Sequence, residues 1–326
     1  MSCDVLCLRP EADFERVGAM PSAALRVVYR AWNDPDVPAL IGKARALVIP
    51  AVGPKLPATL FEGSSVKFVQ VTGAGLDRLD LALLKQRGVA VANVPGGSNE
   101  AVAEYVVTTA SVVVRRFAWA DREIRRGNYK DFRAHMIADS LPGLDGLTAG
   151  IVGFGVIGVA VASAFRKRGC SILFCDPAPR DPRAAAASEA TSCALEELLH
   201  SADIVSLHVP LLPQTTGLIG PRELSLMKPA AVLIQASRGG VVDEAALAAA
   251  LEAGKLGGAA VDVYSAEPPG KDHPLLQLQG EAAQRILFTP HIAGVTRQST
   301  AFLCRAAWRN VERFFGGTQA PQDVVT

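Results

Sequence analysis

One stretch of the chain, residues 149–158, reads Ala149-Gly150-Ile151-Val152-Gly153-Phe154-Gly155-Val156-Ile157-Gly158. Its first four residues form an apolar run that predicts a short buried strand, and residues 156–168 have the pattern of a helix. A glycine loop, Gly153 to Gly158, lies between them. There the first glycine permits a tight turn, the second lets a pyrophosphate approach the backbone, and the third allows close packing of helix on strand. The stretch therefore predicts a dinucleotide-binding unit.

An acid follows this loop at the spacing that a dinucleotide site requires. The next apolar run, residues 171–175, ends at Asp176, eighteen residues after Gly158. A carboxylate there accepts hydrogen bonds from the hydroxyls of an adenosine ribose and repels a 2′-phosphate. NAD is therefore the expected cofactor, and NADP is disfavoured. Arg180 could pair with such a phosphate, but we prefer to interpret it as a solvated loop arginine.

Length and composition restrict the class of protein. A chain of 326 residues, 49% of them hydrophobic, can bury two cores, so we expect two domains. The formal net charge of +1 gives no electrostatic footprint for nucleic acid or an anionic membrane. The six cysteines form no CxxC pair and predict no metal site. Without a signal sequence or a long apolar stretch, we expect a cytoplasmic protein.

Strand-like runs alternate with helical segments along the whole chain. The strand candidates are residues 25–29, 46–49, 66–71, 89–94, 149–152, 171–175, 204–208, 231–235, 259–263 and 286–289. Such alternation predicts an α/β fold with parallel sheets covered on both faces. Residues 99–126 predict one long helix, followed by an irregular segment up to Gly150.

Polar residues with distinct chemistry follow three of the later strands, where ligands of a parallel sheet gather. Arg238 follows the run 231–235, and its guanidinium suits a bidentate bond to a carboxylate. Asp262 ends the next strand, where its carboxylate could accept from a nicotinamide carboxamide, and Glu267 follows it. His291 comes directly after the last strand.

These residue types fit the reduction of a ketone, which receives a proton together with a hydride. Imidazole, with a pKa of about 6.5, suits that transfer near neutrality, so His291 is the candidate acid–base. Glu267 on its other ring nitrogen would fix the tautomer. Arg238 would orient the carboxylate and polarise the carbonyl. Singly, the three fit a capping arginine, a loop glutamate and a buried histidine, but together they favour catalysis.

The chain resembles the D-isomer-specific 2-hydroxyacid dehydrogenases over nearly its whole length. Besides the glycine loop, the motifs that carry the resemblance are Val71-Thr72-Gly73-Ala74-Gly75-Leu76-Asp77, Asn93-Val94-Pro95-Gly96, Val102-Ala103-Glu104, Leu207-His208-Val209-Pro210-Leu211, Met227-Lys228-Pro229, Ser237-Arg238-Gly239, Val242-Asp243-Glu244 and Thr289-Pro290-His291. The resemblance implies an NAD-dependent dehydrogenase with two Rossmann-like domains. They are a smaller, flavodoxin-like substrate domain, residues 1–98, and a doubly wound NAD domain, residues 99–293. Residues 294–326 form a C-terminal helix that returns to the substrate domain.

The family also implies the residues of the site. Catalysis falls to Arg238, Glu267 and His291, and the backbone amides of Ala74 and Gly75 join Arg238 in binding the substrate carboxylate. The predicted NAD-binding residues are Gly153, Phe154, Gly155, Val156, Ile157, Gly158, Asp176, His208, Val209, Pro210, Thr215, Ala236, Ser237, Arg238, Asp262, His291, Ala293 and Gly294. Family members are commonly homodimers that pair through the region corresponding to residues 99–147.

Small unphosphorylated 2-keto acids such as glyoxylate, hydroxypyruvate or pyruvate are the leading substrate class. Lys55 is the only cation in the loop 50–55, so a phosphorylated or otherwise anionic hydroxy acid is the alternative substrate. Glu267 argues against the formate dehydrogenase branch, which carries glutamine there. An NAD-binding corepressor that works through partner recognition is the alternative of a different class. The chain departs from the family at Gln235 and Ala230, which we expect to adjust packing near the cofactor.

Overall fold

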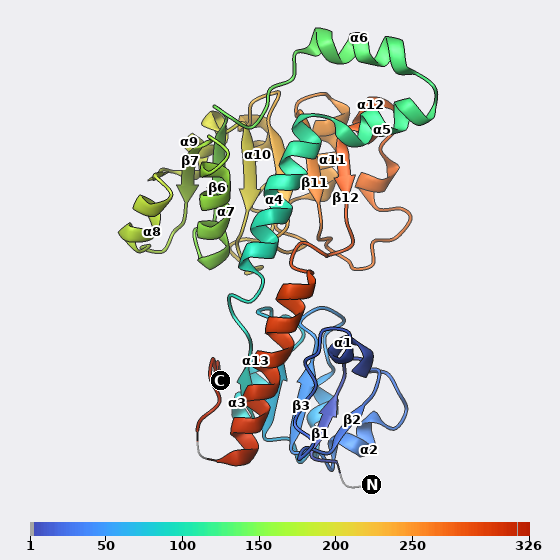
Figure 1. The fold of residues 1–326 in the computed structure, drawn as a ribbon, viewed down its shortest axis with the longest axis vertical. Helices are drawn as coiled ribbons and strands as arrows, with labels where there is room; N and C mark the ends of the chain where they lie inside the picture. Colours follow the sequence, from blue (N-terminus) through green and yellow to red (C-terminus); the bar gives the residue numbers. More distant parts are fainter. Residues whose placement is uncertain (1–2, 318) are drawn as a thin grey trace. The chain divides into compact units, whose positions relative to one another are not determined.

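The computed structural model describes residues 3–317 and 319–326, which form two compact units (Figure 1). One unit comprises the chain up to Ser98 together with the residues from Val295 onward, and the other comprises Asn99–Gly294. Each unit is built on its own parallel sheet, as the alternation of strands and helices predicts. The fold class is therefore confirmed as α/β with two Rossmann-like units.

The first unit has a five-stranded sheet in the order β2-β1-β3-β4-β5, with every pair parallel. This order is that of flavodoxin-like folds. Its elements are β1 Val5–Cys7, α1 Glu11–Glu15, β2 Val27–Tyr29, α2 Val37–Ile41, β3 Ala46–Ile49, η1 Ala58–Phe61, β4 Phe68–Val71, α3 Leu81–Gln86, β5 Ala90–Ala92 and α13 Arg297–Gly316. The interior strand β1 was not among the predicted runs, because three buried residues are too few to show a period.

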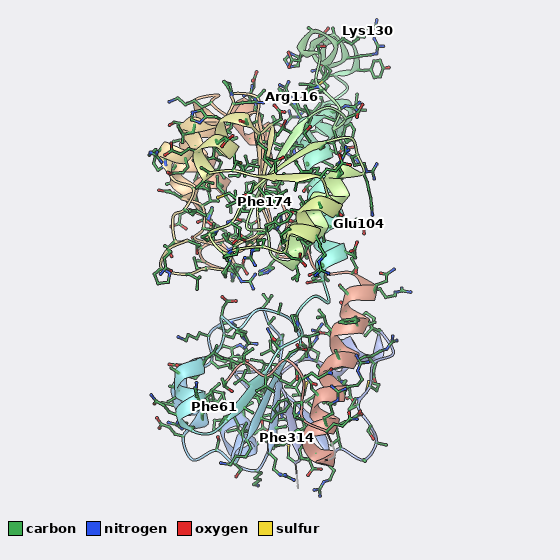
Figure 2. All side chains as sticks on the ribbon, turned by 90° about the vertical axis from the view of Figure 1, so that its left-hand side faces the viewer. Phe61, Glu104, Arg116, Lys130, Phe174 and Phe314 are labelled. Carbon is green, nitrogen blue, oxygen red and sulfur yellow. The ribbon has the colours of Figure 1, made fainter. Side chains whose placement is uncertain are left out.

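Helix α13 completes the core of the first unit from the far end of the sequence. Trp308 on this helix lies with its ring centroid 5.1 Å from that of Phe14. Phe314, which Figure 2 labels on the same helix, stacks on Phe68 with the same centroid distance. Phe14, Phe68 and Trp308 are buried. Aromatic packing of this kind fixes the helix on the sheet although nearly three hundred residues of chain separate Phe14 from Trp308.

The second unit has a seven-stranded sheet in the order β12-β11-β10-β9-β6-β7-β8, again with every pair parallel. Its strands are β6 Thr148–Val152, β7 Ser171–Cys175, β8 Ala190–Ser192, β9 Ile204–Leu207, β10 Val232–Gln235, β11 Gly258–Val261 and β12 Ile286–Phe288. The chain reverses its direction across the sheet between β6 and β9. In doubly wound folds the ligand binds at this switch point, outside the carboxyl ends of the strands.

Helices cover both faces of this second sheet (Figure 1). They are α4 Asn99–Val114, α5 Phe117–Arg125, α6 Tyr129–Asp139, α7 Val156–Arg166, α8 Pro182–Ala187, α9 Leu195–Ser201, α10 Pro221–Leu226, α11 Glu244–Glu252, η2 Pro274–Gln277 and α12 Gly280–Gln284. Helices α4 and α7 bury apolar side chains on one face, and α9, α10 and α11 do so on the other. The glycine loop thus opens a covered helix directly after the interior strand β6.

The prediction of one long helix over residues 99–126 is wrong. Helix α4 ends at Val114, and α5 begins at Phe117 after Arg116, which has a left-handed φ of 52°. The Arg116 side chain forms an ion pair with Asp139 and lies over the ring of Trp119. These contacts hold a turn that the apolar pattern of α4 and α5 does not reveal. The ion pair with Asp139 spans more than twenty residues of sequence.

We predicted an irregular segment between this helix and Gly150. The segment instead contains helix α6. Its residue Phe132 packs on Trp119 with ring centroids 5.3 Å apart. Outside this contact α6 is largely exposed, so its sequence lacks the apolar stripe of a core helix. Figure 1 shows α6 extending from the rest of the second unit, whereas α5 lies beside α12, where Arg122 bonds to Gln284.

Candidate active site

The three glycines of the loop have different surroundings. A Cβ atom on Gly153, where φ is 91°, would lie 2.5 Å from the carbonyl oxygen of His208, and one on Gly158 would lie 2.1 Å from that of Gly153. A Cβ atom on Gly155 would meet nothing within 4 Å. The first and third glycines therefore permit close packing, while the second leaves open space at the N-terminus of α7. Such an opening beside unpaired helix amides fits a pyrophosphate.

Asp176, directly after β7, is held by three donors. Its Oδ2 atom accepts from the amide of Phe154 at 2.7 Å and from Nη2 of Arg180 at 2.7 Å, and Oδ1 accepts from the amide of Ala178 at 2.9 Å. Burial alone would raise the pKa of Asp176, but the Arg180 guanidinium and the two amides lower it below its usual range. Arg180 is an exposed loop residue, as interpreted from the sequence, and it is also the ion-pair partner of the acid.

His208, directly after β9, faces the glycine loop. Its carbonyl oxygen and the side chain of Val209 are what a Cβ atom on Gly153 would touch. The Nε2 atom of His208 lies 2.8 Å from Oγ of Ser206. Burial lowers the pKa of His208 to about 3, so the imidazole is neutral near pH 7. Two of the predicted NAD-binding residues, His208 and Val209, therefore lie against the loop.

The loop after β10 fixes Arg238 from both sides. Gln235, which stands where the resembling family has asparagine, donates from Nε2 to the carbonyl oxygen of Arg238 at 2.8 Å and accepts from Oγ of Ser237 at 2.8 Å. The Nη1 atom of Arg238 donates to the Ser237 carbonyl oxygen at 2.8 Å. A Cβ atom on Gly239 would lie 1.8 Å from the carbonyl oxygen of Tyr264. The Arg238 loop thus packs directly against the segment that leads to Glu267.

His291 and Glu267 form a hydrogen-bonded pair. The Nδ1 atom of His291 lies 2.8 Å from Oε2 of Glu267, and Oε1 of Glu267 accepts from the amide of Tyr264 at 3.1 Å. The two side chains are 26% and 30% exposed, so both are in reach of a small ligand. His291 has a left-handed φ of 55°, a conformation that few side-chain-bearing residues adopt.

Asp262 is fully buried and anchors the turn that carries His291. Its carboxylate accepts from Oγ1 of Thr289 at 2.5 Å and from the amides of Ile292 and Ala293 at 2.9 and 2.8 Å, and its backbone carbonyl accepts from the amide of His291 at 2.8 Å. A carboxylate offers about four acceptor sites, so these bonds use three of them, and the residue exposes no surface to a ligand.

Two tyrosines of this neighbourhood carry no signal that a sequence pattern would identify. Tyr264 donates from its hydroxyl to the carbonyl oxygens of Thr289 and Val261 at 3.0 and 3.2 Å. Burial raises the pKa of Tyr264 to about 12, with the charges of Asp262 and Glu267 adding to the effect. Tyr105 on α4 approaches Thr289 at 2.7 Å. Thr289 lies in a motif that we singled out for His291, whereas nothing marks Tyr105.

The remaining predicted NAD-binding residues occupy turns of the same unit. Thr215 closes the turn after Pro210, because its Oγ1 atom donates to the Pro210 carbonyl at 2.6 Å and accepts from the amide of Leu212 at 2.8 Å. Ala236 and Ser237 follow β10 directly, and Gly294 ends the unit. They therefore follow the carboxyl ends of the strands, as does the Asp262 turn.

Ala74 and Gly75 belong to the first unit, in the turn that follows β4. Asn93 donates from Nδ2 to the Ala74 carbonyl at 2.8 Å. Among the hydrogen bonds of the described residues, none uses the amides of Ala74 or Gly75 as donor.

A cation that the sequence did not single out lies under the neighbouring loop after β3. Arg78 is 3% exposed and donates to the carbonyl oxygens of Pro54 and Pro50 at 2.9 and 3.0 Å. Sequence reasoning counted Lys55 as the only cation of this loop. Arg78 adds a second, which is buried beneath the backbone rather than exposed on it.

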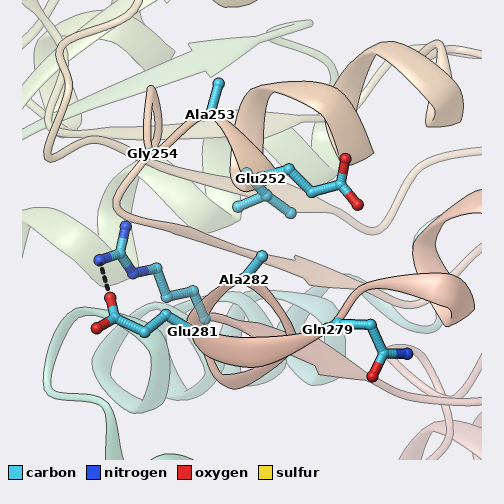
Figure 3. A pocket seen from close by; sticks show the side chains of 8 residues that line it. Glu252, Ala253, Gly254, Gln279, Glu281 and Ala282 are labelled. Atoms are coloured by element: carbon cyan, nitrogen blue, oxygen red, sulfur yellow. Dashed lines mark hydrogen bonds and ion pairs between the residues drawn. The ribbon is translucent and has the colours of Figure 1, made fainter.

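A separate pocket of about 410 Å³ lies at the amino ends of the strands of the second sheet, opposite their carboxyl ends (Figure 3). Glu252, Gly254, Glu281 and Arg285 line it at the amino ends of β11 and β12, and Arg285 pairs with Glu281 at 2.8 Å. None of the predicted site residues lines this pocket. In the described part of the chain no group of three acids, histidines or cysteines could hold a metal, and no helix is long and apolar enough to cross a membrane.

Several known proteins are similar to this chain. Residues 107–293 match the family model described as D-isomer specific 2-hydroxyacid dehydrogenase, NAD binding domain. The chain is 34% identical to the glyoxylate reductase of Thermococcus litoralis, over 90% of this chain and 91% of that one. It is 36% identical to the D-3-phosphoglycerate dehydrogenase of Archaeoglobus fulgidus over 72% of its length, but spans only 42% of that relative. The solved structure of the TT0316 protein from Thermus thermophilus superposes with a TM-score of 0.83 at 30% identity, covering 99% of this chain and 100% of that one.

Proposed function

Since this chain belongs to the D-isomer-specific 2-hydroxyacid dehydrogenases and binds NAD, we propose that it interconverts a small 2-keto acid and the corresponding D-2-hydroxy acid. The observation that carries this proposal is the 2.8 Å hydrogen bond between His291 and Glu267, beside the loop of Arg238. An imidazole that is oriented by a carboxylate and lies next to an arginine can transfer a proton to the ketone oxygen of a 2-keto acid.

His291 is the proposed acid–base. Because its Nδ1 atom faces Glu267, the Nε2 atom is the one that gives a proton to the carbonyl oxygen of the keto acid, or takes it from the hydroxy acid. Glu267 fixes the ring orientation and stabilises the charge that the imidazole carries when protonated. The amide of Tyr264 in turn fixes Glu267. This arrangement keeps the proton donor in one orientation before the substrate arrives.

Arg238 is the proposed partner of the substrate carboxylate, together with the amides of Ala74 and Gly75. The bond from its Nη1 atom to the Ser237 carbonyl restricts the plane of the guanidinium. A planar guanidinium pairs with a carboxylate through two parallel hydrogen bonds, which fixes the acid and also polarises the adjacent ketone.

NAD, when bound, accepts or supplies the hydride. We propose that the N-terminus of α7 faces its pyrophosphate through the opening at Gly155, and that Asp176 binds the hydroxyls of the adenosine ribose. Asp262, which exposes no surface, supports the site through the amides of Ile292 and Ala293. NADP is disfavoured because a 2′-phosphate would approach the Asp176 carboxylate.

Glyoxylate, hydroxypyruvate and pyruvate are the proposed substrates. The relative from Thermococcus litoralis is named a glyoxylate reductase, and a further relative, from Methylorubrum extorquens, a glycerate dehydrogenase. A phosphorylated substrate is the second candidate, because another relative is named D-3-phosphoglycerate dehydrogenase and Lys55 is available to meet a phosphate. A corepressor function is not favoured, since these relatives are named for their reactions.

We further propose that two copies associate through the segment 99–147. Four large apolar side chains of α5 and α6 are about half exposed or more, and contact with a second copy would remove them from water. They are Phe117, Ile124, Tyr129 and Ile137. The six free cysteines fit the reducing cytoplasm as the proposed location. Light scattering of the purified protein tests the dimer.

The reaction is tested by following NADH oxidation with glyoxylate, hydroxypyruvate, pyruvate, larger 2-keto acids and 3-phosphohydroxypyruvate. Turnover that depends on His291 and is lost in His291→Ala supports the proposal and ranks the substrates. NADPH serves as the cofactor control. If NADH binds but no keto acid is reduced by the wild-type protein, the proposed reaction is wrong.

A further inference from the structure

A chain of hydrogen bonds joins helix α4 to the turn of the acid–base histidine. The Oη atom of Tyr105 on α4 lies 2.7 Å from Oγ1 of Thr289, which is 184 residues away in the sequence. Oγ1 of Thr289 lies 2.5 Å from Oδ1 of Asp262. Three side chains from different elements thus form one continuous path that ends at a buried carboxylate.

The Asp262 carboxylate, at the end of this path, determines which group donates in each hydrogen bond. A carboxylate only accepts hydrogen bonds, so the Thr289 hydroxyl donates to Asp262 and must accept from Tyr105. Burial raises the pKa of Tyr105 well above its usual range, and the charge of Asp262 adds to that effect, so the phenol keeps the proton that it donates. Each bond in such a chain polarises the next, and loss of the first weakens the second.

Asp262 depends on hydrogen bonds because no cation pairs with it among the residues that the structure describes. Its carboxylate is fully buried and holds the amides of Ile292 and Ala293, which follow His291. His291 itself has an unfavourable left-handed φ, and these bonds are what keep it there. A shift of the Asp262 carboxylate therefore moves the imidazole relative to Glu267.

The turn does not depend on Tyr105 for its fold. The Tyr264 hydroxyl holds the backbone carbonyl of Thr289 independently, at 3.0 Å. The Tyr105 hydroxyl contacts only the side chain of Thr289. Its loss is therefore expected to loosen the Thr289 and Asp262 side chains without unfolding the turn.

We propose that Tyr105 is a positioning residue for proton transfer, acting on His291 through Thr289 and Asp262. This inference rests on the proposed function, in which His291 is the acid–base. Misplacement of a reacting group by a fraction of an ångström slows the chemical step more than it weakens ligand binding.

The test compares Tyr105→Phe with Ser111→Ala in keto-acid reduction. Ser111 lies on the same helix, and its hydroxyl donates only to the Val107 carbonyl of that helix, at 3.0 Å. We expect Tyr105→Phe to lower kcat roughly tenfold while the substrate KM and the NADH dissociation constant change less than about twofold. Its primary deuterium isotope effect, measured with NADH deuterated at the transferred position, should rise as chemistry becomes rate-limiting. Ser111→Ala should leave all four quantities unchanged.

Variants of Thr289 examine the path itself. Thr289→Val should reproduce the loss of kcat, Thr289→Ser should retain activity, and Tyr105→Phe added to Thr289→Val should cause little further loss, because both act through one path. Wild-type kcat and isotope effect in Tyr105→Phe would overturn this inference alone, and so would additive losses in the double variant. Absence of any keto-acid reduction by the wild-type protein would overturn the proposed function and this inference together.

Discussion

The Nδ1 atom of His291 lies 2.8 Å from the Oε2 atom of Glu267, and the second oxygen of Glu267 is held by the amide of Tyr264. Both oxygens of this carboxylate are thus engaged, one by the imidazole and one by the backbone. The pair joins the loop after β11 to the turn after β12, two neighbouring strands of the same sheet. Its geometry depends on the packing of these two segments against each other.

Replacing Glu267 by glutamine keeps the shape of the side chain but removes the charge that stabilises a protonated His291. We expect Glu267→Gln to lower kcat for keto-acid reduction by about 10²-fold with a smaller change in substrate KM. Steady-state kinetics measure this. Glu281→Gln, at an exposed surface ion pair, is the matched control and should retain wild-type rates. Equal kcat in Glu267→Gln and wild type would mean that the pair has no part in catalysis.

Cofactor preference should depend on the ion pair between Asp176 and Arg180. In Asp176→Ala the repulsion of a 2′-phosphate disappears and Arg180 loses its partner, so it can pair with the phosphate. We expect the ratio of kcat/KM for NADPH to that for NADH to rise about tenfold or more. Adding Arg180→Ala should reverse most of the gain, whereas adding Arg183→Ala, at a 95% exposed side chain, should not. A gain that survives without Arg180 would contradict this role.

Gly239 is required for the contact between the Arg238 loop and the segment that leads to Glu267. A Cβ atom there would overlap the Tyr264 carbonyl at 1.8 Å, so the two backbones must separate in Gly239→Ala. We expect a loss of about 1–3 kcal/mol in the free energy of unfolding, together with a strong loss of kcat. Urea unfolding and kinetics measure both. Gly143→Ala, where a Cβ atom meets nothing within 4 Å, should change neither.

Stability should fall in mild acid because of His208. The folded pKa of about 3 lies below the unfolded value of about 6.5, so between these values only the unfolded chain binds the proton. The stabilisation is complete above pH 6.5 and decreases as the pH falls toward 3. The free energy of unfolding should therefore be about 1 kcal/mol lower at pH 5.5 than at pH 7.5. Urea unfolding of His208→Gln should show a pH dependence shallower by that amount.

The exposed residue His200, on α9, provides the control for this measurement. His200→Gln should keep the wild-type dependence of unfolding free energy on pH. Identical slopes for His208→Gln and wild type would show that the imidazole of His208 titrates as it does in the unfolded chain.

Much of the fold follows from patterns that are local in the sequence. The apolar runs around Ile151 and Ser171–Cys175, with the glycines between them, predict the doubly wound sheet of the second unit, and the structure confirms it. The same reasoning failed for α6, whose few apolar contacts form with Trp119 of a different helix. It also failed for β1, a strand too short to show a period.

The sequence by itself determined which chemical groups stand at the strand ends, because in a parallel sheet every strand presents its carboxyl end at the same edge. Arg238, Asp262, Glu267 and His291 were identified in this way. Only the tertiary structure decided how they are held: that Asp262 anchors the His291 turn, that Arg180 pairs with Asp176, and that Tyr105 reaches Thr289. The physical reason is that a hydrogen bond forms only within about 3 Å. Whether two side chains come that close depends on how α4, β11 and β12 pack, and no spacing in the sequence specifies that distance.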